Sequence, residues 1–323
     1  MPAKIAKSRH MPSNLVSDRP PLISLLRILS MVLIGFVLVG PFFGVGVASL
    51  LYGADFLTHM SDPLGHPEIK YAILLSQGIA STVGLILLPV FYLYQSERKK
   101  ISSFFYNEPS WLVVIPAVAA GVIGVAVAIS PVVEWNMNIE FPESMAAFGN
   151  WVRSTENLAA NIIKAITANL TPSSFAVTLL VVAVIAAFGE EFVFRGLIQN
   201  EMTRAVRNPH LAIWLTAIFF SAFHLQFLGF FPRVLLGAFL GYLYYWSGNL
   251  WVPILAHFLN NGIQVIGLYL YQQGIISTDI ESTESAPWKM VAIAIVLTGV
   301  LFVFYKNYFL SRSTSIRGFT QEL

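Results

Sequence analysis

Long apolar runs recur along the whole chain, and they leave a bundle of membrane helices as the fold that the chain can adopt. Runs of about 20 apolar residues are long enough to cross roughly 30 Å of hydrocarbon. Their approximate centres are Gly35, Leu85, Val122, Val181, Phe219, Phe239, Ile263 and Leu297. Such segments must be helices, because lipid offers no partner to unpaired backbone groups. The sequence therefore predicts an all-α polytopic membrane protein of about eight transmembrane helices.

The composition supports the same class and excludes others. Of the 323 residues, 56% are hydrophobic and 11% are charged, whereas about a quarter are charged in a soluble domain. The net charge of +2 and the lack of a basic stripe indicate no nucleic-acid partner. The chain has no cysteine, which excludes disulfides, a thiol nucleophile and thiolate metal ligands. We expect a basic tail at residues 1–21 and a single transmembrane domain at 22–323.

Basic residues mark one side of the predicted bundle. They lie in the N-terminal tail, the loop after the second span, the connection after the fourth span and the C-terminal tail, at Lys4, Lys7, Arg9, Arg19, Arg98, Lys99, Lys100, Arg204, Arg207, Lys306, Arg312 and Arg317. Lys and Arg concentrate in cytoplasmic loops. We therefore expect a multi-pass integral protein with both termini cytoplasmic, in a bacterial plasma membrane. Residues 157–170, in the longest loop, have apolar residues at helical spacing and are predicted to lie along the membrane surface.

Two adjacent carboxylates, Glu190 and Glu191, end one of these apolar runs. Acidic groups inside a membrane are costly unless they are paired or used in function. Glu191 and Arg195 have the i, i+4 spacing with the acid first, which favours an ion pair, although Arg195 is equally compatible with an interfacial anchor. Glu190 points about 100° away around the helix. This division leaves Glu190 free to face a pocket as a general base.

Two histidines also fall inside apolar spans. His224 and Glu190 each lie about 25 Å from the predicted turn near Arg207, at 1.5 Å per residue, and therefore at the same depth. His257 and Asn261 are one helical turn apart and share a face of a later span. All four side chains can converge on one pocket inside the bundle, with His224 nearer the non-cytoplasmic face.

The ordered motifs resemble those of a known family. They are Glu190-Glu191-x-x-x-Arg195, Phe220-x-x-x-His224 and His257-x-x-x-Asn261, each in its own apolar span. In this order they resemble the CaaX protease and bacteriocin-processing (CPBP, or Abi) family, which includes the Ras-converting CaaX prenyl protease. The resemblance covers about residues 174–271. It implies an intramembrane glutamic endopeptidase with its catalytic core in that segment.

The resemblance also implies a role for each motif residue. Glu190 with His224 would activate a water molecule, and His257 with Asn261 would hold the oxyanion. Peptide hydrolysis needs such a base together with donors aimed at the developing oxyanion. A neutral imidazole and an amide would supply those donors without a buried charge. The neighbouring residues that would support them are Glu191, Arg195 and Phe220. The substrate would be a membrane-associated protein or peptide, and the sequence leaves open whether it is prenylated.

Three other interpretations remain at this point. In the first interpretation, the polar residues in the spans would only form hydrogen bonds between helices. In the second, two histidines and a glutamate would bind zinc, although the His-Glu-x-x-His pattern is absent and the resemblance predicts no cofactor. In the third, the chain would be a non-proteolytic bacteriocin-immunity or scaffold protein of the membrane.

Overall fold

The structure, a computed structural model, describes residues 18–277 and 283–319, with side chains up to residue 311. Every regular element in this part of the chain is a helix, which confirms the predicted all-α class. The helices are α1 (Pro21–Ile34), η2 (Gly35–Val39), α2 (Gly40–Tyr52), α3 (Phe56–His59), η3 (Pro67–Ile69), α4 (Lys70–Ser81), η4 (Thr82–Leu87), α5 (Leu88–Ser96), η5 (Ile101–Phe104), α6 (Trp111–Met137), η6 (Glu143–Met145), α7 (Ala146–Thr167), α8 (Pro172–Thr178), η7 (Leu179–Ile185), α9 (Ala186–Glu191), η8 (Phe192–Gln199), α10 (Asn200–Val206), α11 (Pro209–Phe223), α12 (Phe230–Ser247), α13 (Trp251–Gln272) and α14 (Trp288–Phe319). Most of the predicted basic tail, residues 1–17, lies outside the described residues.

Five helices are long and apolar enough to cross a membrane. They are the continuous segments Pro21–Tyr52, Pro67–Ser96, Trp111–Met137, Pro172–Val206 and Trp288–Ser311. The other three predicted span centres also lie in helices, α11, α12 and α13. Of these, α11 is apolar but has only 15 residues. The described chain is therefore an integral multi-pass membrane protein, and the remaining three spans stay a prediction.

The fourth long segment, Pro172–Val206, is the central one. Half of its apolar window is buried, against 17% for Trp288–Ser311, which lies at the edge of the bundle beside α6. All eight residues of η8 are buried. Its apolar residues pack against α1, α5, α11 and α13 in the largest cluster of the core. The acidic pair precedes η8 directly, so the centre of the bundle surrounds it.

Glycines allow two of the outer helices to approach closely. A Cβ atom at Gly40 or Gly44 of α2 would overlap the carbonyl oxygens of Ala80 and Ser76 on α4. Gly-x-x-x-Gly spacing permits such backbone contact. Gly40 and Gly44 therefore allow α2 and α4 to pack closely.

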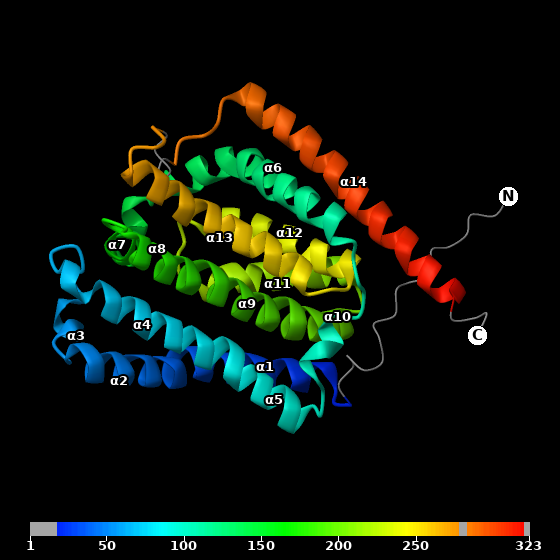
Figure 1. Cartoon of the computed structure of the whole chain (residues 1–323), viewed down its shortest axis with the longest axis horizontal. Helices are drawn as coiled ribbons and strands as arrows, with labels where there is room; N and C mark the ends of the chain where they lie inside the picture. Colours follow the sequence, from blue (N-terminus) through cyan, green and yellow to red (C-terminus); the bar gives the residue numbers. More distant parts are fainter. Residues whose placement is uncertain (1–17, 278–282, 320–323) are drawn as a thin grey trace.

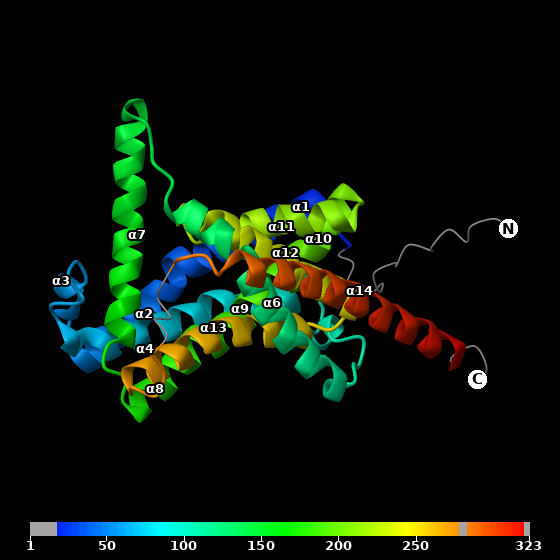
Figure 2. The same ribbon diagram turned by 90° about the horizontal axis from the view of Figure 1, so that it is seen from above.

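Helix α7 lies across one end of the bundle, nearly perpendicular to the long helices (Figures 1 and 2). Its large apolar side chains include Trp151, Leu158 and Ile163, all at least 47% exposed. Its C-terminal half packs through Ile166 against the loop between α2 and α4. An exposed apolar face on a helix in this direction is typical of the membrane surface. The surface position of residues 157–170 stays a prediction.

Candidate active site

The glutamate pair ends α9 at the centre of the bundle, between the π-helical segments η7 and η8. The side chains of Glu191 and Arg195 are fully buried and form an ion pair, in which Nη1 of Arg195 donates to Oε1 of Glu191 over 2.6 Å. Nη2 of Arg195 donates to the carbonyl oxygen of Gly237 over 2.9 Å. The predicted pairing is thus present. An interfacial anchor is excluded for Arg195, because an anchor holds its guanidinium in water.

Glu190 faces the other way and meets both membrane histidines. Its Oε2 lies 3.9 Å from Nε2 of His224 and 3.8 Å from Nε2 of His257. No side chain or backbone group of the described residues hydrogen-bonds to this buried oxygen. The distances are too long for direct hydrogen bonds and short enough for one water molecule to contact two of the groups. Three of the four side chains that were predicted to converge, Glu190, His224 and His257, therefore meet here.

His224 ends α11, and its ring is oriented by its own helix. Asn208 caps the start of α11 by accepting from the backbone N–H groups of His210 and Leu211, and Pro209 at the first position favours a helix start there. At the other end, Nδ1 of His224 lies 2.9 Å from the carbonyl oxygen of Phe220. A carbonyl only accepts, so Nδ1 carries a proton. In a neutral ring, Nε2 then faces Glu190 as an acceptor.

His257 is oriented by a different partner, Glu191. Its Nδ1 donates to Oε1 of Glu191 over 2.7 Å, the oxygen that also accepts from Arg195. This bond fixes the proton on Nδ1. A neutral His257 therefore presents a bare Nε2 to the pocket, and only its imidazolium form donates there. A neutral His257 was predicted to donate to the oxyanion. The bond of its Nδ1 to Glu191 does not allow this, because the proton of the neutral ring is then on Nδ1.

Asn261 is held by the backbone of the neighbouring helix. Its Nδ2 donates to the carbonyl oxygen of Val182 over 3.0 Å, and its Oδ1 accepts from Nδ2 of Asn260 over 3.1 Å. One N–H of the Asn261 amide remains after the bond to Val182. Asn261 is therefore fixed against η7, about two helical turns before Glu190, and it has one donor left for another group.

The ring of Phe220 packs among the charged groups of the site. The guanidinium of Arg195 lies 4.7 Å from its centroid, a distance typical of a cation–π contact. The rings of His224 and His257 meet it edge to face, at 5.0 and 6.0 Å between centroids. Phe220 thus contacts Arg195 and both histidines, which gives this motif residue a physical role.

Sequence reasoning missed the side chains that hold the turn after His224. Leu225 has a left-handed backbone with φ of 54°, a conformation that costs energy for a residue with a Cβ atom. Three side chains bond to residues 226–231, those of Asn136, Glu156 and Arg233. Glu156 accepts from the backbone N–H of Leu228 over 2.7 Å. Both Glu156 and Glu190 act electrostatically on Arg233. Arg233 could have been noticed in the sequence, because it is a cation inside a predicted apolar span.

The donor atoms of the site are not arranged as a compact metal centre. Among the described residues, one group of His, Cys, Asp or Glu side chains is compact enough to hold an ion, with its ligand atoms all within 4.8 Å of one another. It consists of His59, His66 and Glu68. Glu190, His224 and His257 do not meet that distance, although each histidine is within 4 Å of Glu190. A zinc ion at this site would require the two imidazoles to move together.

Comparison with known proteins identifies the segment that carries these residues. Residues 172–263 match the family of Type II CAAX prenyl endopeptidase Rce1-like proteins. Uncharacterized protein YpbD of Bacillus subtilis (strain 168) is 30% identical over 89 residues, which are 26% of this chain and 42% of YpbD. No solved structure matches the chain. The matched segment 172–263, which includes all three motifs, is therefore similar to the Rce1-like CAAX prenyl endopeptidase family, as the motifs predict.

Proposed function

We propose that this chain is an intramembrane endopeptidase that hydrolyses a peptide bond of a membrane-associated protein or peptide, with Glu190 as the general base. The observation that carries the proposal is the placement of Oε2 of Glu190 between two imidazoles, at 3.9 and 3.8 Å, without a hydrogen-bond partner among the described residues. The neighbouring Glu191 is neutralised by Arg195. One carboxylate is thereby committed to structure and the other remains for chemistry.

The orientation of His224 supports a direct way to activate water. Its Nε2 and Oε2 of Glu190 are both acceptors in the neutral-ring state, because Nδ1 of His224 bonds to Phe220. A water molecule between them donates one hydrogen to each and directs an oxygen lone pair at the scissile carbonyl. As the C–O bond forms, the proton passes to Glu190, which returns it to the leaving nitrogen when the C–N bond breaks.

The charges around Glu191 favour His257 as the group that stabilises the oxyanion. Oε2 of Glu190 lies 3.8 Å from Nε2 of His257, and Oε1 of Glu191 lies 2.7 Å from its Nδ1. Two neighbouring carboxylates favour the imidazolium form of His257, in which Nε2 is a donor. To act as the second donor, Asn261 would have to reach the site with its remaining N–H, since its bond to Val182 holds it about two helical turns from Glu190. Donors fixed in advance in a region without bulk water stabilise a developing oxyanion strongly.

The proposal requires no cofactor and no metal, since the base and the donors are side chains. Its partners are the lipid bilayer and a polypeptide substrate, with no nucleic acid. The turn after His224 bonds to Glu156 of α7, so His224 lies toward the end of the bundle that carries α7. With both termini cytoplasmic, that end is the non-cytoplasmic one. A prenylated CaaX tail and an unmodified membrane peptide are then separate substrate classes to be tested.

The proposal is tested by comparing the membrane proteomes of cells that carry the wild-type chain or Glu190→Gln. Glutamine keeps the size of the side chain and removes the base, so an uncleaved substrate should accumulate. The matched control is Glu143→Gln, an exposed acid outside the site, which should cleave as the wild type does. Purified protein is then given the accumulated substrate with and without a chelator.

The other interpretations predict different outcomes. Activity that a chelator removes and zinc restores would establish a metal enzyme. Full cellular function of both Glu190→Ala and His224→Ala would instead establish a non-proteolytic role in binding a partner.

A further inference from the structure

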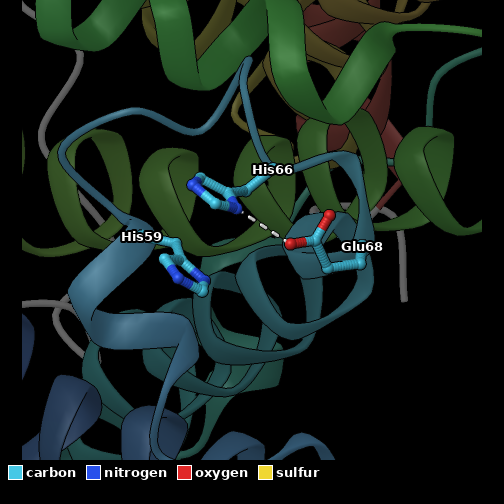
Figure 3. A group of neighbouring side chains, drawn as sticks. All are labelled: His59, His66 and Glu68. Carbon is cyan, nitrogen blue, oxygen red and sulfur yellow. Dashed lines mark hydrogen bonds and ion pairs between the residues drawn. The ribbon is translucent and has the colours of Figure 1, made fainter.

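A second cluster of titratable side chains lies far from the glutamate pair, in the loop between α2 and α4. His59 ends the short helix α3, and His66 and Glu68 lie at the start of η3. Figure 3 shows the three side chains next to one another. Their ligand atoms all lie within 4.8 Å of one another. The loop is at the end of the bundle that carries α7 (Figure 1).

We propose that His59, His66 and Glu68 form a binding site for a divalent transition-metal ion of the zinc type. Two imidazoles and one carboxylate are a ligand set that zinc accepts, with water in the fourth position. The set lacks thiolates and has few carboxylates, so it favours zinc over the hard ions magnesium and calcium. The site is separate from the proposed peptidase centre and does not depend on that function.

The fold holds the backbone of each ligand while leaving its side chain accessible. Phe56, one helical turn before His59, is buried, and so is Ile69, next to Glu68. Both pack in one cluster with Ile166 of α7. The histidines are half-buried and Glu68 is exposed. The ligands therefore start from fixed positions, and their side chains can still rotate.

The present contacts require only small movements to bind an ion. Nδ1 of His66 lies 2.9 Å from Oε1 of Glu68, and the rings of His59 and His66 stack with centroids 3.7 Å apart. Zinc bonds of about 2.0–2.1 Å in tetrahedral geometry place neighbouring ligand atoms roughly 3.4 Å apart. An ion must also lie near the plane of each imidazole, so the two stacked rings have to tilt. Rotation of accessible side chains achieves both.

Metal binding would tie the two ends of this loop together. His59 and Glu68 lie on either side of residues 60–67, and a bridge between them reduces the freedom of that segment. The same loop is one of the surfaces on which α7 rests. The ion would therefore stabilise the packing between the loop and α7.

The test uses the full chain, purified in detergent without a histidine tag and stripped of metal, and titrated with Zn²⁺ by calorimetry. We expect one equivalent of Zn²⁺ to bind. His59→Gln or His66→Gln should weaken the affinity by roughly a hundredfold or more, because loss of a residue that only hydrogen-bonds to a metal ligand already lowers metal affinity by up to that factor. The matched control is His210→Gln, an exposed histidine at the start of α11 that contacts Tyr242. This variant should bind like the wild type.

Two further measurements keep the test decisive. Thermal unfolding without metal checks that each variant is folded, and with Zn²⁺ the midpoint should rise for the wild type and His210→Gln alone. Co²⁺ should give the visible absorption of a four-coordinate site in the same two proteins. The proposal is overturned if the wild type binds Zn²⁺ no more tightly than folded His59→Gln/His66→Gln, or if His210→Gln loses the bound equivalent.

Discussion

His257 donates from Nδ1 to Oε1 of Glu191 over 2.7 Å, and this bond connects α13 to the glutamate pair of α9. Glu191 accepts from Arg195 with the same oxygen. The buried carboxylate thereby orients one imidazole and neutralises one guanidinium. Within the described part of the chain, no group makes a comparable bond to Oε2 of its neighbour Glu190. Two adjacent residues of the same type thus have separate tasks, and they should respond differently to the same substitution.

Glu191→Gln should destabilise the protein far more than Glu190→Gln. Removing the charge of Glu191 leaves Arg195 buried without a counter-ion, which typically costs about 3–5 kcal/mol. Glu190 is 17% exposed and has no ion pair with a fixed cation, so its neutral variant should unfold close to the wild type. Thermal unfolding in detergent measures the difference. Equal unfolding midpoints for the two variants would contradict this division.

The double variant Glu191→Gln/Arg195→Met checks the cause. Replacing both members of a buried ion pair by neutral groups is often nearly neutral for stability. The double variant should therefore recover most of the stability lost in Glu191→Gln. A double variant as unstable as the single one would show that the charge of Arg195 is not the source of the loss.

Phe220→Ala should cost about 3–5 kcal/mol, as expected for a buried phenylalanine, and should also lower cleavage by disturbing both histidines. The ring is 2% exposed and contacts Arg195, His224 and His257. The adjacent Phe219 is 42% exposed and provides the matched control. Unfolding midpoints and cleavage rates of Phe219→Ala should stay close to those of the wild type. A similar loss in both variants would refute a special role for Phe220.

Gly44→Ala should destabilise the contact between α2 and α4 by about 1–3 kcal/mol, the usual cost of overpacking. The added methyl group overlaps the carbonyl oxygen of Ser76, a backbone atom that cannot rotate away. Gly46 is two residues further along the same helix and has no atom within 4 Å of a built Cβ. Gly46→Ala should therefore be neutral or slightly stabilising, because alanine favours helix over glycine. An unfolding midpoint of Gly44→Ala that is no lower than that of Gly46→Ala would contradict this prediction.

The absence of cysteine allows the orientation of the bundle to be measured directly. Ser61 and Lys100 are exposed and lie in loops at opposite ends of the bundle. With both termini cytoplasmic, a membrane-impermeant thiol reagent added outside intact cells should label Ser61→Cys and spare Lys100→Cys. The reverse pattern would invert the predicted topology. It would also place the end that carries α7 in the cytoplasm.

Much of the site was predictable from local patterns. The pairing of Glu191 with Arg195 follows from i, i+4 spacing on one helix, and the common depth of Glu190 and His224 follows from counting residues in two helices. The tautomer of His257 was not predictable, because it depends on a carboxylate of another helix. The same holds for the bond of Asn261 to Val182 and for the turn held by Glu156 and Arg233. Those contacts join segments that no sequence spacing relates.

The sequence by itself determined that the chain folds as membrane helices, because a lipid environment permits little else for long apolar runs. It also determined which polar residues lie inside them. Only the tertiary structure decided which glutamate each histidine contacts, and which histidine turns an acceptor toward the pocket. It alone brought His59 and His66 together across a loop. These outcomes depend on how helices pack and rotate against one another, and a fraction of a turn changes the partner of a side chain.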